Sequence, residues 1–238
     1  MRFSKRDHQT WFILFARQLT NVERFACQEF KEGFAKLNLS PNRIPTLADL
    51  NQRITPTTGW KVTRTPSRYM TRQEWFTAFT RKEFPITGYI RGSNELDFTP
   101  EPDIFHDVFG HQPFMTLPQY VEIFEMFALA WPKAKSELQR RAIGRLAWFG
   151  YEFGLIREEG KLKAFGAGLL SSFSEIKNIA DPKIPKREFT VENVIQGHKP
   201  DGTRVGDRVY GVTENTELFV FGSLNHLKSE LASYFITL

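Results

Sequence analysis

The chain has 238 residues, of which 41% are hydrophobic, 14% aromatic and 25% charged. This composition is typical of a globular protein and excludes a disordered, collagen-like or coiled-coil chain. The net charge is +5, and an excess of the same size lies in Lys61–Arg91, where aromatic residues alternate with cations. Single-strand nucleic-acid sites have that pattern, but a solvated face or an anion pocket is more common. We therefore expect no nucleic-acid partner.

The first part of the chain is predicted to be helical. An apolar stripe at three- and four-residue steps predicts one long amphipathic helix, capped by Asp7 and continuing to about Leu39. Two prolines end it, and Thr46 can cap a short helix after them. Thr71 begins a Thr-x-x-Glu capping box, which predicts a further helix to about Lys82.

Helices also dominate the middle of the chain, most clearly over Pro118–Ala130 and Ala134–Arg157, and Ser223 can cap a final helix. Short strands are predicted at Lys61–Thr65, Ile86–Ile90, Phe189–Ile195, Arg208–Val212 and Leu218–Phe221. No linker separates independent cores. We expect one domain over residues 1–238, mainly α with a small β-sheet or hairpin.

Cysteine usage and hydropathy indicate the cellular compartment. The single cysteine, Cys27, allows no internal disulfide, and a buried apolar role suits it better than a nucleophilic one. The longest early apolar run, 11–16, is too short to span a bilayer, and no signal-peptide cleavage site follows it. We expect a cytoplasmic protein with no membrane partner.

The densest group of chemically useful side chains lies between Thr99 and Pro113. It contains His106 and His111, which would lie about 140° apart on an ideal helix. Gly110 and Pro113 favour a helix that ends between the two imidazoles, so that the chain turns and carries the second back towards the first. Two convergent neutral imidazoles suit a borderline metal ion.

A third ligand must come from elsewhere, and Glu152 is the candidate. It lies in an apolar helical stretch, where a carboxylate is costly unless it binds a partner. Two histidines and one carboxylate form the facial triad of non-haem Fe(II) oxygenases. The alternatives are a hydrogen-bonded core histidine for His106 and a salt bridge from Glu152 to Arg145 or Arg157. Spacing alone does not separate iron from zinc.

Three motifs in matching order carry a family resemblance. They are Pro102-Asp-x-x-His-Asp-x-Phe-Gly-His-x-Pro113, Trp148-Phe-x-x-Glu-Phe-Gly-Leu155 and Phe165-Gly-Ala-Gly-Leu-Leu-Ser-Ser172. Together they resemble the pterin-dependent aromatic amino acid hydroxylases, in particular the short bacterial phenylalanine 4-hydroxylases. The similarity runs from about Asn21 to the end of the chain and includes a C-terminal strand at Glu214–Phe221.

The resemblance implies a role for each matched residue. The catalytic metal ligands would be His106, His111 and Glu152. Arg91 would hold the amino-acid carboxylate and Asp103 would orient it; the remaining substrate residues would be Thr99, Pro102, Trp148, Phe153 and Ser171. The cofactor would bind at Tyr69, Met70, Trp75 and Asp107.

The activity implied by the resemblance is ring hydroxylation of an aromatic amino acid, with phenylalanine converted to tyrosine. Fe(II), a tetrahydropterin and the co-substrate O2 would supply the chemistry, while the protein supplies ligands, orientation and exclusion of water. The resemblance also implies the catalytic-domain fold, without a regulatory domain or tetramerisation helix, and a monomer. The alternatives are a tryptophan or other aromatic hydroxylase, and a divergent iron-binding relative with another substrate.

Several positions depart from the family pattern. Pro66–Met70 stands where many members have a Gly-Leu-Leu segment beside the pterin. Ala147 and Phe165 replace tyrosines, and Gln112 occupies a usually apolar position. The lost bulk predicts a larger pocket, which would also admit a bulkier substrate such as tryptophan. His198–Asp207 is expected to form an additional hairpin.

Overall fold

The computed structural model describes residues 3–66, 68, 70–197, 203–205, 208–210 and 214–238. The α-helices are α1 (Lys5–Phe25), α2 (Gln28–Leu37), α3 (Leu47–Thr58), α4 (Arg72–Thr80), α5 (Gln112–Met115), α6 (Pro118–Ala130), α7 (Glu137–Ala147), α8 (Ala167–Ser171), α9 (Val191–Gln196) and α10 (Leu224–Phe235). There are also the π-helices η1 (His106–His111) and η3 (Trp148–Glu152) and the 3-10 helices η2 (Trp131–Lys133) and η4 (Glu175–Ile179). The strands are β1 (Lys61–Arg64), β2 (Glu83–Ile86), β3 (Leu155–Glu158), β4 (Lys161–Ala164), β5 (Lys186–Glu188), β6 (Thr203–Val205), β7 (Arg208–Tyr210) and β8 (Leu218–Phe221). The fold is mainly α with small sheets, as the sequence predicts.

The first apolar stripe forms two helices instead of one. Between α1 and α2 the backbone of Ala26 and Cys27 is extended. Ala26 forms a bridge with Ala164, and the amide of Cys27 donates to the carbonyl of Ala164 at 3.0 Å. The single helix expected to continue to Leu39 is therefore wrong, because hydrogen bonding to β4 replaces the helical hydrogen bonds at this point.

Three of the four helix caps expected from the sequence are found in the structure. Thr46 and Thr71 cap α3 and α4 through capping boxes, and Ser223 caps α10. In α1 the cap is Ser4, and Asp7 is its reciprocal partner three residues later. The prediction of Asp7 as the cap is wrong because a carboxylate at the third helical position can accept from the cap's own amide.

The main sheet has the strand order β4-β3-β8-β5, in which β8 runs parallel to β3 and β5 while β4 is antiparallel to β3. The helix expected to continue to Arg157 is wrong, because it ends at η3 and the chain enters β3. The strand expected over Phe189–Ile195 is also wrong. There Thr190 accepts from the amide of Asn193 and caps α9, and β-branched residues form strands only where packing supports a strand.

The two smaller sheets each contain two strands. β1 and β2 pair in parallel, and α4 connects them. The second strand begins at Glu83 and ends at Ile86, so the strand expected over Ile86–Ile90 is misplaced. β6 and β7 form an antiparallel hairpin, in which β6 lies within the insertion 198–207 and β7 follows it, in the strand expected over Arg208–Val212. Residues 198–202 and 206–207 of that insertion lie outside the described residues.

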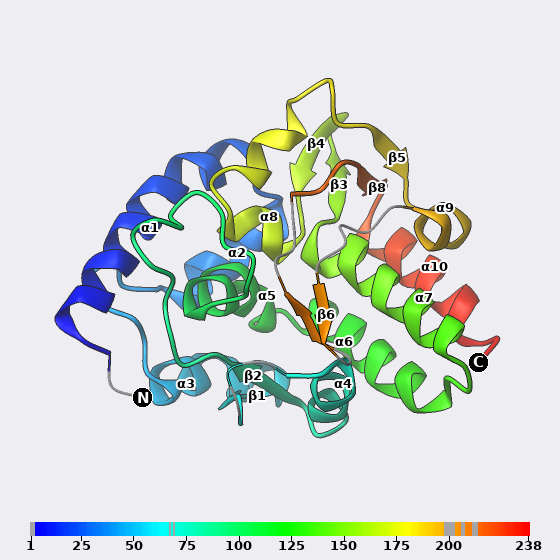
Figure 1. Ribbon diagram of the computed structural model, residues 1–238, viewed down its shortest axis with the longest axis horizontal. Coiled ribbons are helices and arrows are strands. Elements are labelled where there is room, and N and C mark those ends of the chain that lie inside the picture. The colour runs from blue at the N-terminus through cyan, green and yellow to red at the C-terminus, as the bar shows by residue number, and fades with distance from the viewer. Residues whose placement is uncertain (1–2, 67, 69, 198–202, 206–207, 211–213) are drawn as a thin grey trace.

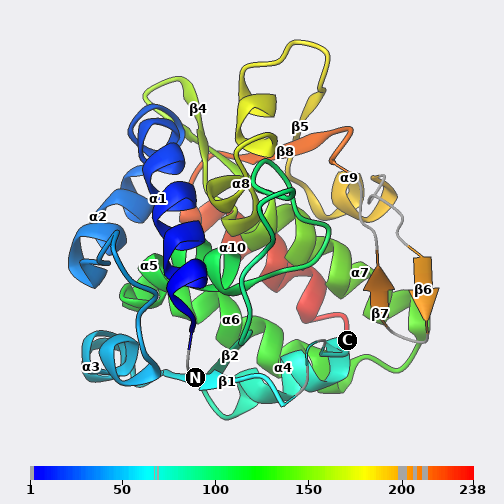
Figure 2. The same ribbon diagram turned by 60° about the vertical axis from the view of Figure 1, so that its left-hand side comes forward.

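The metal-ligand motif runs through the aromatic core. In both views α8 lies between α1 on one side and α7 on the other (Figures 1 and 2). Phe109 of η1 has its ring centroid 5.3 Å from Phe15, 5.2 Å from Phe34 and 4.7 Å from Phe105. These aromatic contacts fix η1 within the core.

Among the described residues, no helix is both long enough and apolar enough to cross a membrane.

Candidate active site

The π-helix η1 has His106 as its first residue and His111 as its last. Hydrogen bonds in a π-helix join residues five apart, so these two positions lie on the same face. The two Nε2 atoms are 3.2 Å apart, and the rings meet at 88°. The helix end expected between the imidazoles is wrong: the helix continues into α5, and its wider turn brings the rings together.

Gly110 allows η1 to approach α8 closely. A Cβ at this position would lie 2.7 Å from the carbonyl oxygen of Ala167. The glycine between the two histidines therefore allows close packing, and it does not end the helix in the way that the sequence suggests. Gly168 has the same role beside the second motif, because its Cβ would lie 2.4 Å from the ring of Phe153.

Glu152 is the last residue of η3, and its carboxylate faces both imidazoles. Its Oε1 lies 3.2 Å from Nε2 of His111, and its Oε2 lies 3.5 Å from Nε2 of His106. One ligand atom from each residue lies within 4.8 Å of the other two. Arg145, an alternative partner for this carboxylate, instead donates to the carbonyl of Ile195.

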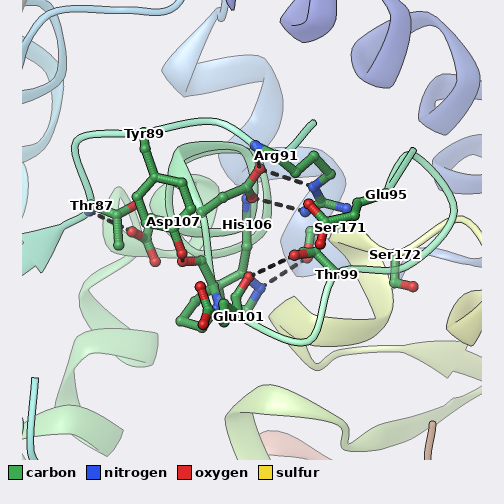
Figure 3. Close-up of polar contacts among 12 residues, drawn as sticks. Thr87, Tyr89, Arg91, Glu95, Thr99, Glu101, His106, Asp107, Ser171 and Ser172 are labelled. Carbon is green, nitrogen blue, oxygen red and sulfur yellow. Dashed lines mark hydrogen bonds and ion pairs between the residues drawn. The ribbon is translucent and has the colours of Figure 1, made fainter. Parts of the chain in front are cut away.

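Ser171 fixes the tautomer of His106. The Ser171 hydroxyl donates its one proton to the carbonyl of Ala167 at 2.8 Å, and its oxygen lies 2.9 Å from Nδ1 of His106 (Figure 3). The oxygen must therefore accept from Nδ1–H, which leaves the Nε2 lone pair directed at the other two ligands. Burial lowers the pKa of His106 to about 4. The imidazole is thus neutral at pH 7, as metal binding requires.

The residues present fit an iron ion. Two imidazole nitrogens and a carboxylate converge on one point. Lone pairs and a negative charge this close repel one another unless a cation lies between them. Two histidines and one carboxylate also leave coordination positions open, as a non-haem Fe(II) site needs.

Arg91 and Asp103 form a buried bidentate ion pair. Arg91 donates from Nε to Oδ2 at 2.9 Å and from Nη2 to Oδ1 at 2.8 Å, and both side chains are almost fully buried. Burial by itself would raise the pKa of the Asp103 carboxyl, but the charge and hydrogen bonds of Arg91 lower it below its usual range. Asp103 also accepts from the amide of His106 at 3.0 Å. This carboxylate therefore joins the arginine to the metal-ligand helix.

The three candidate ligands border a cavity of about 320 Å³. It is also lined by the predicted substrate residues Arg91, Thr99, Pro102, Trp148, Phe153 and Ser171 and by the predicted cofactor residues Met70, Trp75 and Asp107. Asp103 is the one predicted and described site residue outside the lining, because it lies buried behind Arg91. Tyr69 lies outside the described residues.

Aromatic rings form two parts of the cavity wall. The rings of Trp148 and Phe153 have centroids 4.5 Å apart and are inclined at 36°. Trp75 packs against Phe84 at 5.1 Å, and Phe84 packs against His111 at 5.1 Å. The cavity therefore offers flat apolar surfaces close to the metal ligands, as a pocket for an aromatic ring requires.

Asp107 is held by a residue that the sequence analysis did not predict. The amide of Thr87 donates to its Oδ2 at 2.6 Å (Figure 3). Burial raises the pKa of Asp107 to about 7 in spite of this bond. Nothing in the sequence around Thr87 indicates the contact, because it depends on how the loop after β2 lies on η1.

Glu175 is a second unpredicted residue of the cavity lining. It is 1% exposed and is the only acidic residue between positions 160 and 180. The criterion that identified Glu152, a lone carboxylate in an apolar stretch, would not have identified Glu175, because Ser174 and Lys177 lie beside it in the sequence.

Known proteins match both the sequence and the structure. The sequence profile of the biopterin-dependent aromatic amino acid hydroxylases matches residues 1–235. The chain is 36% identical to the phenylalanine-4-hydroxylase of Chromobacterium violaceum over 186 residues, which are 78% of this chain and 62% of that protein. It is 38% identical to the Pseudomonas aeruginosa phenylalanine-4-hydroxylase over 175 residues, 74% of this chain and 66% of that protein. The matched regions thus span less than two thirds of these relatives.

Solved structures agree. The C. violaceum phenylalanine hydroxylase with bound iron(III) and 7,8-dihydrobiopterin superposes with a TM-score of 0.87 and 30% identity, covering 99% of this chain and 83% of that one. The apo enzyme of Colwellia psychrerythraea gives a TM-score of 0.85 at 27% identity, covering 100% and 89%. The chain belongs to the biopterin-dependent aromatic amino acid hydroxylases. The expected family and catalytic-domain fold are confirmed.

Proposed function

We propose that this protein is a non-haem Fe(II)- and tetrahydropterin-dependent monooxygenase that uses O2 to convert phenylalanine to tyrosine. One observation carries the proposal: His106, His111 and Glu152 converge at the wall of an aromatic-lined cavity that also contains Arg91. Metal ligands, a carboxylate-binding cation and a flat apolar wall are the parts that ring hydroxylation of an amino acid needs. The named activities of the similar proteins support it.

Three residues would hold the iron, namely His106, His111 and Glu152. When bound, Fe(II) and the tetrahydropterin together activate O2 and supply the electrons for hydroxylation. Ser171 keeps the Nε2 lone pair of His106 available, because its hydroxyl accepts from Nδ1–H. Three protein ligands would leave further coordination positions of the ion open on the side of the cavity.

Arg91 would bind the substrate carboxylate. Asp103 engages Nε and Nη2, whereas Nη1 makes no hydrogen bond within the described part of the chain. The ion pair thus orients the guanidinium and leaves a donor for an anion. Thr99 would add a hydroxyl beside that anion. The substrate ring would lie against Pro102, Trp148 and Phe153, and this apolar wall would exclude water from the reacting carbon.

The pterin would lie on the side of the cavity formed by Met70, Trp75 and Asp107. Trp75 offers a flat surface for stacking. The Asp107 carboxyl can exchange hydrogen bonds with the ring nitrogens of the pterin, and the amide of Thr87 fixes its orientation. Tyr69 is proposed for this side from the family resemblance alone.

The deciding experiment is mass spectrometry after Fe(II)-loaded protein is incubated with tetrahydrobiopterin, O2 and phenylalanine. Tyrosine formation is expected from the wild type. His106→Ala, His111→Ala and Glu152→Ala should each lose both iron and tyrosine formation, whereas His226→Ala, remote from the cavity, should keep both. An iron-replete and active Glu152→Ala protein would contradict the ligand assignment. Pterin consumption without tyrosine would indicate a relative with another substrate.

Tryptophan is the second candidate substrate. Ala147 lines the cavity beside Trp148, and its small side chain leaves room for a larger ring. An equimolar mixture of the two amino acids distinguishes the candidates, because the ratio of hydroxylated products reports the ratio of kcat/KM values.

We further propose that residues 1–238 act as one catalytic domain, as a cytoplasmic monomer that binds no nucleic acid. One hydrophobic core cluster extends from Trp11 to Phe235, which supports the single domain. In the basic segment Lys61–Arg91, four of the cations form ion pairs with carboxylates of the protein: Arg68, Arg81, Lys82 and Arg91. Light scattering after gel filtration tests the monomer, and an oligonucleotide shift at low salt tests nucleic-acid binding.

A further inference from the structure

The indole of Trp148 has a single hydrogen-bond donor, and a buried amide accepts from it. Nε1 of Trp148 donates to Oδ1 of Asn215 at 2.9 Å. Trp148 lines the cavity, whereas Asn215 lies just before β8 and is 2% exposed. The hydrogen bond therefore fixes the plane of a ring that forms part of the cavity wall.

Glu175 determines which way the Asn215 amide points. Its Oε1 accepts from the backbone amide of Asn215 at 2.8 Å and from Nδ2 of the same residue at 3.0 Å. A flipped amide would place its oxygen against the carboxylate and its NH2 group against the indole N–H, so both contacts would become repulsive. The orientation that presents Oδ1 to Trp148 is thus the only one that satisfies both neighbours.

Glu175 is itself held from two further positions. Its Oε2 accepts from Nδ2 of Asn178 at 3.1 Å, and its amide donates to the hydroxyl of Ser172 at 3.2 Å. Within the described residues no lysine or arginine forms an ion pair with this carboxylate. A buried acid without a cation is costly, and its bonds here lead through Asn215 to the cavity wall.

We propose that Glu175 and Asn215 are positioning residues that hold the Trp148 indole in the plane against which the substrate ring lies. The proposal rests on the proposed function, in which the substrate ring lies against Trp148. A ring held in this way limits the rotation of the substrate within the cavity. Loosening it should therefore weaken amino-acid binding and increase pterin oxidation that is not coupled to hydroxylation.

The test compares Asn215→Leu with Gln73→Leu. Gln73 makes an equivalent amide–indole hydrogen bond to Trp131 at 2.8 Å, but neither residue lines the cavity. In Asn215→Leu we expect KM for phenylalanine to rise about fivefold, the loss of roughly one hydrogen bond, with little change in KM for the pterin. Pterin oxidised per tyrosine formed should rise as well. Gln73→Leu should leave all three quantities unchanged.

A readout independent of activity is hydrogen exchange at the indole Nε1–H of the metal-free protein, measured by NMR. The Trp148 signal is assigned by its loss in Trp148→Phe. We expect Asn215→Leu to accelerate its exchange at least about tenfold, while the Trp11 signal, whose Nε1 donates to the Ser40 carbonyl, stays unchanged. Asn215→Ser, whose hydroxyl is too short to reach the indole, should give the same result if the leucine variant does not fold.

Unchanged Trp148 exchange with unchanged KM would overturn the proposal. Accelerated exchange at Trp11 as well, or equal losses for every substrate, would show a general structural role and would also overturn it. If the wild type hydroxylates no amino acid, the proposed function fails instead, and the exchange measurement still decides whether Asn215 holds Trp148.

Discussion

The Nδ1 atom of His106 lies 2.9 Å from the hydroxyl oxygen of Ser171, a residue 65 positions later in the chain. The hydroxyl proton goes to the carbonyl of Ala167, so the oxygen acts as an acceptor towards the imidazole. The tautomer of a candidate metal ligand is therefore set by a residue of α8. The contact depends on the close approach of α8 to η1 that Gly110 allows.

Replacement of Ser171 by alanine should weaken metal binding without unfolding the protein. The Nδ1–H group of His106 loses its acceptor, so the ring can rotate or change tautomer. We expect Fe(II) affinity to fall about 10- to 100-fold, the usual effect of removing such a support. Competition with a chelator measures it. Ser174→Ala, three residues later and outside the cavity lining, is the control, and equal affinity in both variants would contradict the assignment.

The Arg91–Asp103 pair should respond differently to single and double replacement. Asp103→Leu leaves a buried guanidinium without its partner and should cost about 3 to 5 kcal/mol in the free energy of unfolding. Arg91→Met combined with Asp103→Leu removes both charges and should recover most of that loss, yet should not restore phenylalanine binding. Urea unfolding and calorimetric titration measure the two effects. A double variant as unstable as the single one would show that the charge is not the cause.

Glu175 should make stability depend on pH. Burial raises its pKa from 4.5 to about 7, so between these values the unfolded chain has released the proton while the folded protein retains it. The contribution of this protonated carboxyl to the free energy of unfolding is therefore complete below pH 4.5. It decreases as pH rises to 7, by up to about 3 kcal/mol. Urea unfolding measures the free energy of unfolding of the wild type and of Glu175→Gln across this range. As pH rises, the wild type should lose stability relative to the variant. Parallel curves would contradict the raised pKa.

Gly110→Ala should disturb the metal site through packing. The added Cβ would lie 2.7 Å from the Ala167 carbonyl oxygen, so η1 and α8 must separate. We expect a loss of about 1 to 3 kcal/mol in stability, together with weaker metal binding. Gly150→Ala is the matched control, because Gly150 also lies in a π-helix and its Cβ would meet nothing closer than 3.8 Å. Thermal unfolding and metal content distinguish the two variants.

Local signals predicted much of the fold. The caps at Thr46, Thr71 and Ser223 start helices where expected, and Pro118–Ala130 is a helix with the predicted bounds. These signals succeed because a cap or an apolar stripe involves groups only three or four residues apart. The strand expected over Phe189–Ile195 failed because residue preference alone does not provide a partner strand.

Within the site, residue types and their neighbours in the chain were enough to identify the candidate metal ligands. Two histidines and a lone carboxylate in apolar surroundings indicate a metal through their chemistry, and the family motifs agree. The sequence did not determine how His106 and His111 meet. It favoured a helix end at Gly110, whereas the structure contains a continuous π-helix, in which Gly110 packs against Ala167.

The residues that support the site could be recognised only from the packed structure. Ser171 lies 65 residues from His106, and Asn215 lies 40 residues from Glu175. The amide of Thr87 reaches Asp107 across 20 residues. No local pattern encodes such contacts, because they form only when separate helices and strands pack and exclude water from the polar groups between them. The sequence thus identifies the candidate side chains for the chemistry, and packing orients each of them.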